Sequence, residues 1–334
     1  MSLEVRRDMA LADLVGLVVK IGKSKSSAFK VKGSGSGHPV QISNLGYSFL
    51  ELFAAIGWTL CAPPEVRFDP RIEIIAAATL ARNLGAFTPD SLKGMMSRDP
   101  WGAASVLNGL FDEVRHEVNS RAFMHRLQRH RDKYATRLSD LTTYFKQVAK
   151  LHPSATVLQL ELRKRANILR EGDLSQRYAV DLSQWLAGWL GSASAAYGEA
   201  IVGNAWKIDY DVSDGFFAHV VLVVDGPQPI EIEGMTRALV ESWRSMCGPG
   251  AYLEDCKGPG IELEYRGRKT NAWTLSLEDE LRDVAIFLAS TDSLFGWDYG
   301  GNPATHGRGR VPAAATRSRV ESARKSPPPQ SLVI

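Results

Sequence analysis

The chain has little cysteine, no long apolar run and almost no excess of either charge. Its 334 residues include three cysteines, and none of them forms a CxxC pair, which argues against a disulfide framework or a zinc knuckle. No apolar stretch approaches the roughly 20 residues that a membrane helix needs, and the N-terminal segment lacks the clean apolar core of a signal peptide. The formal net charge of +3 only weakly indicates an acidic partner. We therefore expect a cytoplasmic protein with reduced cysteines and no contact with a membrane.

The sequence does contain enough apolar residues for two globular cores. A hydrophobic content of 44% and a charged content of 23% are those of an ordinary globular protein. Residues 1–150 are expected to form a helical N-terminal domain, because apolar residues recur there at three- and four-residue steps. Residues 307–334 combine Arg with Ala, Ser and Pro, and are expected to form a disordered basic tail.

Between these parts, residues 151–306 follow a different period. Leu158, Leu160 and Leu162 alternate with polar residues, which predicts a half-buried strand. The elements expected after it are a helix over 181–197, strands over 201–210 and 216–224, a helix over 233–246, a strand over 261–266 and a helix starting at Ser276. Ser276 and Asp279 fit a capping box at the start of that last helix. This order predicts an α+β fold with helices packed on an antiparallel sheet.

Short motifs in this second half carry the strongest functional signal. They are Ala205-Trp206-Lys207-Ile208-Asp209, the segment from Asp214 to Gly226 with Phe217 and His219, Phe287-Leu288-Ala289-Ser290-Thr291-Asp292, and Thr305-His306-Gly307-Arg308-Gly309. In order and spacing they resemble the YagK/YfjJ C-terminal domain family, which includes inovirus-type rolling-circle replication initiators of the HUH type. The resemblance covers about residues 150–310.

The resemblance implies an HUH-type antiparallel sheet and a specific chemistry. In the family, two histidines one residue apart on a strand point to the same face. With a nearby carboxylate they hold a divalent metal ion, which polarises the scissile phosphate of single-stranded DNA. A helix-borne tyrosine then attacks the phosphate and forms a covalent link, with a lysine nearby.

This chain departs from the family at four of these positions. Phe217 stands in the place of the first histidine, while His219 keeps the second. Asp209 replaces a glutamate, Phe287 replaces the tyrosine, and Ser290 replaces the lysine. Because a phenylalanine cannot form a phosphoester, the resemblance implies little or no nicking activity.

His219 and Asp209 remain as candidate metal ligands. If residues 213–215 form the hairpin loop, Asp209 pairs directly with His219, and other loop lengths shift that pairing. Completed by water, the pair would bind Mg²⁺ or Mn²⁺ weakly. The alternative is a packed strand histidine beside a solvated or hydrogen-bonded carboxylate. Tyr299 is either another nucleophile or an ordinary loop aromatic residue.

Candidate contacts to nucleic acid are basic side chains in three parts of the chain. They are Lys207, Arg126, Arg129, Arg308 and Arg310. The basic stretch around Arg126 is either a face that follows a nucleic-acid backbone or an ordinary solvated helix.

These patterns together predict a phage- or plasmid-type, initiator-like protein that binds single-stranded DNA with little or no nicking. One alternative is a metal-dependent nicking enzyme that uses another nucleophile. A second alternative is a protein-interaction scaffold whose helical half binds a partner.

Overall fold

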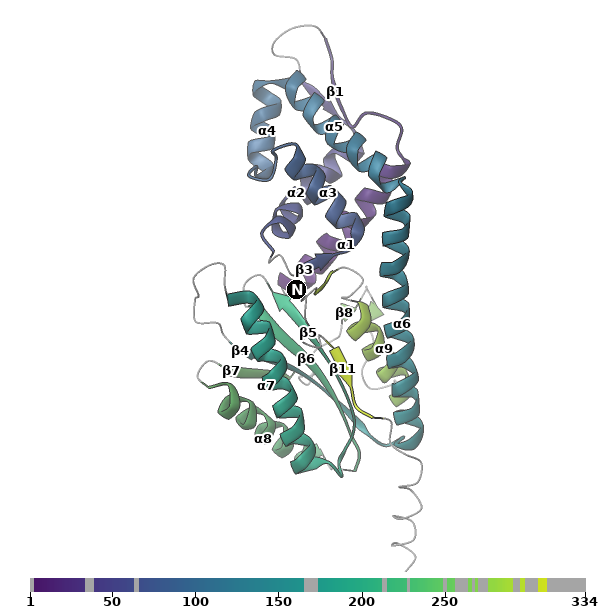
Figure 1. Ribbon diagram of the computed structural model, residues 1–334, viewed down its shortest axis with the longest axis vertical. Helices are drawn as coiled ribbons and strands as arrows, with labels where there is room; N and C mark the ends of the chain where they lie inside the picture. Colours follow the sequence, from purple (N-terminus) through teal and green to yellow (C-terminus); the bar gives the residue numbers. More distant parts are fainter. Residues whose placement is uncertain are drawn as a thin grey trace, which may run out of the picture.

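The computed structural model describes residues 3–33, 39–62, 66–164, 174–211, 215–226, 229–248, 251–255, 264–265, 268–269, 276–290, 295–297 and 306–310. Helices and strands alternate irregularly along these residues (Figure 1). None of the described helices is both long enough and apolar enough to cross a membrane.

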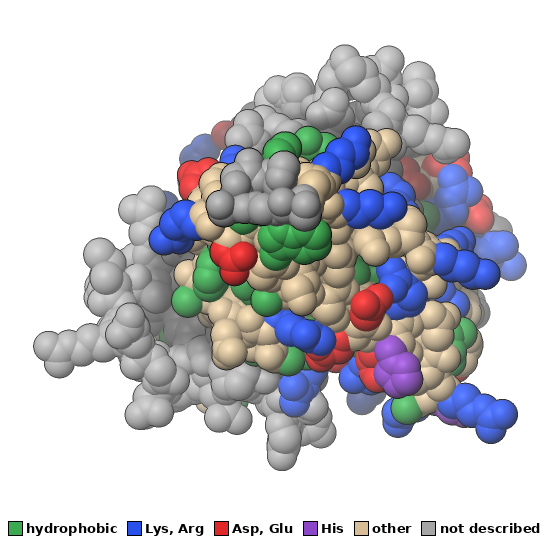
Figure 2. All heavy atoms as spheres, turned by 90° about the horizontal axis from the view of Figure 1, so that it is seen from above, with side chains coloured by type: hydrophobic (Ala, Val, Ile, Leu, Met, Phe, Trp, Pro, Cys, Tyr) green, Lys and Arg blue, Asp and Glu red, His purple; other side chains and the backbone are tan. Residues whose placement is uncertain are grey.

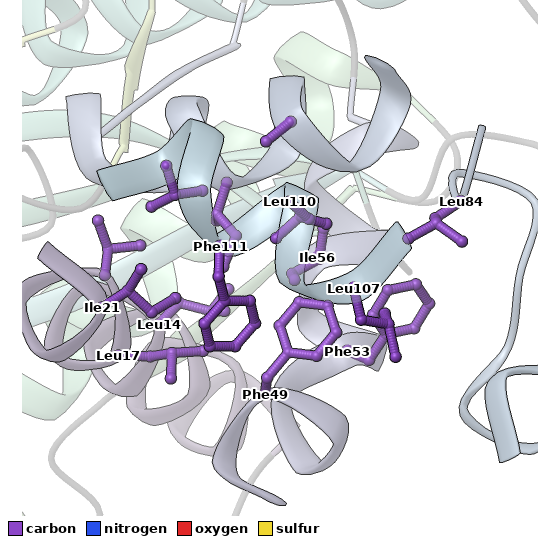
Figure 3. Close-up of a cluster of buried hydrophobic side chains, with 14 of the residues drawn as sticks. Leu14, Leu17, Ile21, Phe49, Phe53, Ile56, Leu84, Leu107, Leu110 and Phe111 are labelled. Carbon is purple, nitrogen blue, oxygen red and sulfur yellow. The ribbon is translucent and has the colours of Figure 1, made fainter. Parts of the chain in front are cut away.

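The N-terminal half is mainly helical, as predicted, and has its own apolar core. Its elements are α1 (Leu3–Lys23), β1 (Phe29–Val31), β2 (Val40–Ile42), α2 (Asn44–Leu60), β3 (Val66–Phe68), α3 (Pro70–Ala81), α4 (Pro89–Arg98) and α5 (Pro100–Val118). Phe49, Phe53 and Phe111 lie in the centre of this core with leucines of α1 and α5 (Figure 3). Phe49 and Phe111 meet edge to face, with ring centroids 5.4 Å apart. This core is the reason that the apolar residues recur at helical spacing.

The long helix α6 (Arg121–Leu151) joins this core to the second half of the molecule (Figure 1). At its start, Phe123 and Leu127 are buried in the N-terminal core. Near its end, Tyr144 and Phe145 are buried against the sheet described next. The residues 128–140 between these ends are exposed or only partly buried. His130 Nε2 lies 3.8 Å from the buried Asp69 carboxylate, and Leu138 packs against the second core.

The second half is built on a five-stranded antiparallel sheet. Its strands are β4 (Thr156–Lys164), β5 (Ile201–Asp211), β6 (Gly215–Val224), β7 (Ala251–Asp255) and β11 (His306–Arg308), in the spatial order β11-β5-β6-β4-β7. The chain runs β4, α7 (Leu174–Tyr197), β5, β6, α8 (Pro229–Cys247), β7. This is the β-α-β-β-α-β unit of split βαβ folds. The sheet and its helices confirm the predicted α+β class.

Both faces of the sheet are covered by helices. On one face, α7 and α8 pack over the even-numbered residues of β4 and β6, with Trp189 and Trp243 in the centre. The other face is covered by the second half of α6 and by α9 (Leu277–Ser290) (Figure 1). The prediction of a half-buried β4 is therefore wrong, since Gln159 and Arg163 on its polar side are 8% and 6% exposed.

Several boundaries differ from the predicted ones. Residues 306–308 form β11, which pairs with β5, so the expected tail at 307–334 does not begin at 307. The rest of that tail, from residue 311, lies outside the described residues. The predicted strand over 261–266 contains only β8 (Glu264–Tyr265), paired with β9 (Arg268–Lys269), whereas the strand that completes the sheet is β7. A further short pair joins β10 (Phe295–Trp297) to β3.

Candidate functional site: a buried charged cluster on the sheet

The hairpin of β5 and β6 places most of the predicted site residues on one face of the sheet. Asp209 pairs across the strands with Phe217, and Lys207 pairs with His219. The pairing of Asp209 with His219, which a hairpin loop over residues 213–215 would give, does not form, because the partner of Asp209 lies two residues from His219. Because side chains alternate with period two, all four residues still point to the same face. That face is the one covered by α6 and α9.

The side chains on this face form a line of alternating charges. The Arg163 guanidinium contacts Glu161 Oε2 through Nε at 3.0 Å and Nη2 at 2.9 Å. His219 Nδ1 lies 3.5 Å from Glu161 Oε1, and His219 Nε2 lies 3.8 Å from Asp209 Oδ2. Lys207 Nζ donates to the same Asp209 oxygen at 3.2 Å. The imidazole thus stands between two carboxylates, each of which also contacts a cation.

Two phenylalanine rings lie against the imidazole. The Phe217 ring meets His219 edge to face at 4.8 Å between centroids, and Phe287 of α9 does the same from the other element at 4.9 Å. Arg163 stacks on Phe217, with Cζ 4.0 Å from the ring centroid. Phe217, which stands in the place of the first histidine of the resemblance, therefore binds the Arg163 cation on its ring face.

Four positions that the resemblance names lie close together in the structure. Residues 209, 217 and 219 on the hairpin and Phe287 on α9 do converge in the structure. Ser290 lies on the same helix, 6% exposed, and its hydroxyl donates to the Phe287 carbonyl at 3.1 Å. It therefore contributes to the end of α9.

A further cation reaches the cluster from α6. Burial lowers the pKa of Arg137 to about 10, and the charge of Asp209 opposes that shift. The carboxylate of Asp209 therefore lies in the field of Arg137 as well as beside Lys207. Sequence reasoning missed Arg137, because it lies in the helical segment outside the resemblance.

The donor set does not fit a divalent metal ion. Two carboxylates and one histidine face the positive charges of Arg137, Arg163 and Lys207. A divalent cation placed between His219 and Asp209 would have to compete with the Lys207 ammonium at 3.2 Å. Within the described part of the chain, no group of three or more His, Cys, Asp or Glu side chains has the arrangement of a metal site. The two residues instead match the alternative of a packed histidine beside a hydrogen-bonded carboxylate.

The predicted nucleic-acid contacts lie in different environments. Lys207 is 2% exposed, so its predicted contact with a nucleic-acid backbone is inconsistent with this structure. Arg308 forms a two-bond pair with Asp140, with both nitrogen–oxygen distances 2.7 Å. Arg126 is partly buried and lies over the Phe123 ring, whereas Arg129 and Arg310 are exposed. Tyr299 lies outside the described residues.

His306 on β11 extends the cluster to the edge of the sheet, where it pairs with Lys207. Desolvation lowers the pKa of His306 to about 4, and the cations Arg137, Lys133 and Lys207 lower it further, while Asp140 opposes them. The surroundings of this histidine are therefore cationic.

Compared with known proteins, the chain matches no family model, no curated protein and no solved structure. The functional assignment therefore depends on the geometry of the cluster and on the resemblance of its motifs.

Proposed function

We propose that this chain is an initiator-like protein of the HUH type that binds single-stranded DNA and does not nick it. The observation that carries the proposal is the convergence of Asp209, Phe217, His219 and Phe287 on one face of the sheet. These four positions were singled out by the motif resemblance alone. They are also the positions at which a nicking enzyme would hold its metal and its nucleophile.

The absence of nicking follows from the chemistry of the side chains at these positions. Phe287 has a ring but no hydroxyl, so it cannot attack a phosphate. Asp209 and Glu161 are neutralised by cations of the protein, and the cluster is closed by α6 and α9. A buried, ion-paired cluster of this kind has a structural role.

DNA contact is assigned to cations outside the cluster. Arg129 and Arg310 are exposed, and each would add electrostatic affinity for a phosphate backbone. Arg308 and Lys207 are engaged within the protein and are not assigned to DNA contact.

The test is a combined gel-shift and adduct assay on labelled single-stranded oligonucleotides with Mn²⁺. We expect a shifted band and no covalent adduct on a denaturing gel. An Arg129→Gln/Arg310→Gln variant should bind more weakly, while Arg98→Gln, at another exposed arginine on α4, serves as the control. A covalent adduct from the natural protein would show an active enzyme with another nucleophile.

A second candidate function is a protein-interaction scaffold. Large aromatic side chains are exposed on the helical half, with Tyr47 at 54%, Trp58 at 42% and Trp101 at 54%. Hydrophobic side chains also lie between charged ones on the face seen from the end of the molecule in Figure 2. Exposed aromatic residues are common in protein interfaces. If the natural protein shifts no oligonucleotide, this second candidate replaces the first.

A further inference from the structure

A basic surface lies in the N-terminal half, far along the sequence from the buried charged cluster. Between Asp13 and Glu51 the sequence contains no Asp or Glu. The same segment contains five lysines, which we call the lysine surface: Lys20, Lys23, Lys25, Lys30 and Lys32. All five are exposed, and no ion pair links any of them to another residue of the described ranges. The segment therefore presents uncompensated positive charge to solvent.

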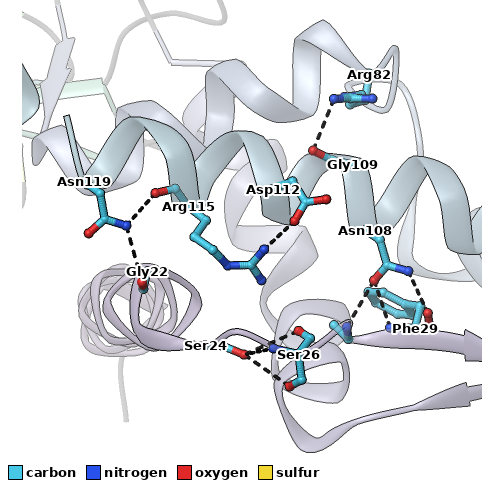
Figure 4. Close-up of polar contacts among 11 residues, drawn as sticks. Gly22, Ser24, Ser26, Phe29, Arg82, Asn108, Gly109, Asp112, Arg115 and Asn119 are labelled. Carbon is cyan, nitrogen blue, oxygen red and sulfur yellow. Dashed lines mark hydrogen bonds and ion pairs between the residues drawn. The ribbon is translucent and has the colours of Figure 1, made fainter.

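The backbone that carries these lysines is held firmly in place. Asn108 of α5 accepts hydrogen bonds from the Ala28 and Phe29 amides, both at 3.1 Å, and donates to the Phe29 carbonyl at 2.7 Å (Figure 4). Asn119, at the end of α5, donates to the Gly22 carbonyl at 3.5 Å. A charged surface on an ordered backbone loses less conformational entropy when it binds a ligand.

The strand pair β1–β2 gives the lysine surface its shape. Lys30 lies opposite Gln41 in the register, and both side chains are exposed on the outer face of the ribbon. Phe29, on the inner face, is 1% exposed and meets Phe111 edge to face. A two-stranded ribbon with a polar outer face has the dimensions that a DNA major groove admits.

The acidic side chain of Asp112, labelled in the same view as this segment, is already paired with an arginine. Asp112 of α5 forms an ion pair with Arg115 of the same helix (Figure 4). Its charge is therefore matched within α5.

We propose that the lysine surface binds the phosphate backbone of double-stranded DNA. Lysines act as point charges toward phosphates and carry no base specificity, so the contact is one of positioning. Within residues 20–32 the aromatic side chain, Phe29, is buried, so the segment offers no stacking platform for unpaired bases. Ile21 and Ala28 are also buried, which disfavours insertion into a lipid surface. The inference does not depend on single-strand binding by the second half.

The experiment measures binding of the full chain to a short labelled DNA duplex by fluorescence anisotropy, between about 50 and 200 mM salt. The test variant is Lys25→Gln/Lys30→Gln/Lys32→Gln, which leaves Lys20 and Lys23 to stabilise the last turn of α1. The matched control is Lys93→Gln/Lys146→Gln/Lys150→Gln, at exposed lysines of α4 and α6 with the same change in charge.

We expect the plot of log affinity against log salt to become shallower by about 2.7 in the test variant, since each lost phosphate contact removes about 0.9. The control should keep the slope of the natural protein. Equal losses in both variants would mean that only net charge matters and would overturn the proposal. Unchanged duplex binding in the test variant would also overturn it.

Two comparisons separate this surface from other partners. Binding of the natural protein to vesicles of anionic phospholipid, without binding to the duplex, would assign the surface to a membrane and reject the proposal. A single-stranded oligonucleotide in the same assay reports on the proposed function. If the natural protein binds the duplex but not the single strand, the proposed function is rejected and the assignment of the lysine surface stands.

Discussion

The side chains of the charged cluster act through their burial. Lys207 and Asp209 have side chains that are 3% and 2% exposed, and their nearest charged atoms are 3.2 Å apart. Water cannot replace either partner at such depth. An uncompensated charge left behind there is costly, whereas the pair as a whole is close to neutral in its effect on stability.

We predict that Lys207→Met lowers the free energy of unfolding by about 3 kcal/mol, because it removes the buried ammonium that lies 3.2 Å from the Asp209 carboxylate. The double variant Lys207→Met/Asp209→Leu should recover a large part of that loss. Urea unfolding followed by circular dichroism measures both. A double variant less stable than Lys207→Met would contradict this explanation.

His306 gives a prediction for pH. Its pKa is lowered to about 4 in the folded protein, below the value of about 6.5 in an unfolded chain. The folded state therefore binds fewer protons in this window, so the contribution of His306 to stability is complete above about pH 6.5 and is lost as the pH falls toward 4. Since the side chain is partly exposed, solvent screening keeps the effect on stability small.

The direct measurement is an NMR titration of the His306 ring. We expect it to remain neutral at pH 6, where an unperturbed histidine is mostly protonated. A midpoint near 6.5 for His306 would show that neither desolvation nor the surrounding cations act on the ring.

Single residues also mark the limit of what the sequence could predict. The motifs named Asp209, Phe217, His219 and Phe287, which lie together in the structure. Glu161 and Arg163 were not predicted as members of the site, because their alternation with leucines is the same for a solvated strand face and for a face covered by a second layer of helices. Only the position of α6 separates these two cases.

At the scale of elements, the sequence predicted helix ends well where a capping residue or a glycine marks them. Ser276 caps α9, as one half of the predicted capping box requires: its Oγ accepts from the Asp279 amide at 3.2 Å and donates to the Asp279 carboxylate at 2.7 Å. The helix predicted over 233–246 ends at a glycine, since Gly248 has a φ of +77° and follows the last residue of α8. Short strands without such signals, β7 and β11 among them, were missed.

The edge strand β11 is attached to α6 through one arginine. Arg308 binds Asp140 by two hydrogen bonds and lies over the Tyr144 ring at 5.1 Å, while Tyr144 accepts from the Asn204 amide of β5 at 2.9 Å. The hydrogen bond with Arg308 lowers the pKa of the Asp140 carboxyl. The position of β11 therefore depends on a contact with a different layer of the fold.

We predict that Arg308→Ala detaches β11 without unfolding the sheet, with a loss of stability of only about 1 kcal/mol. Hydrogen exchange of the Gly309 amide, which donates to the Asn204 carbonyl at 2.8 Å, should become faster by tenfold or more on this scale. Arg310→Ala, two residues later at an exposed position, is the control and should leave that exchange rate unchanged. Equal acceleration in both variants would contradict a specific role for Arg308.

At the scale of the whole molecule, α6 couples the two halves. Its ends are buried in different cores, and the residues 128–140 between them are exposed or only partly buried, with His130 3.8 Å from Asp69 and Leu138 packed against the second core. The predicted boundary at residue 150 thus lies at the end of a helix that both cores share. Helical periodicity locates such a helix, but cannot show to which core each of its turns belongs.

A helix-breaking substitution in that middle segment tests the coupling. Ala135 is exposed, so Ala135→Pro should act mainly by breaking the helix, at a cost of about 3 kcal/mol. Ala135→Gly keeps the backbone amide, and should cost only about 1 kcal/mol. In differential scanning calorimetry we expect the natural protein to unfold in one transition and the proline variant in two. A single transition in the proline variant would mean that other contacts couple the halves.

Because both cores share α6, the chain cannot be cut into two halves without opening one of the cores. A fragment beginning after residue 150 would lose Leu141, Tyr144, Phe145 and Val148, all almost completely buried, and each such side chain contributes about 1.5–3 kcal/mol. The sheet would then expose an apolar face, which is a surface for aggregation. A cut at the start of α6 would instead remove Phe123 and Leu127 from the N-terminal core. Neither half is therefore a portable module, and genetic recombination that separated them would leave one of the two products with an open core.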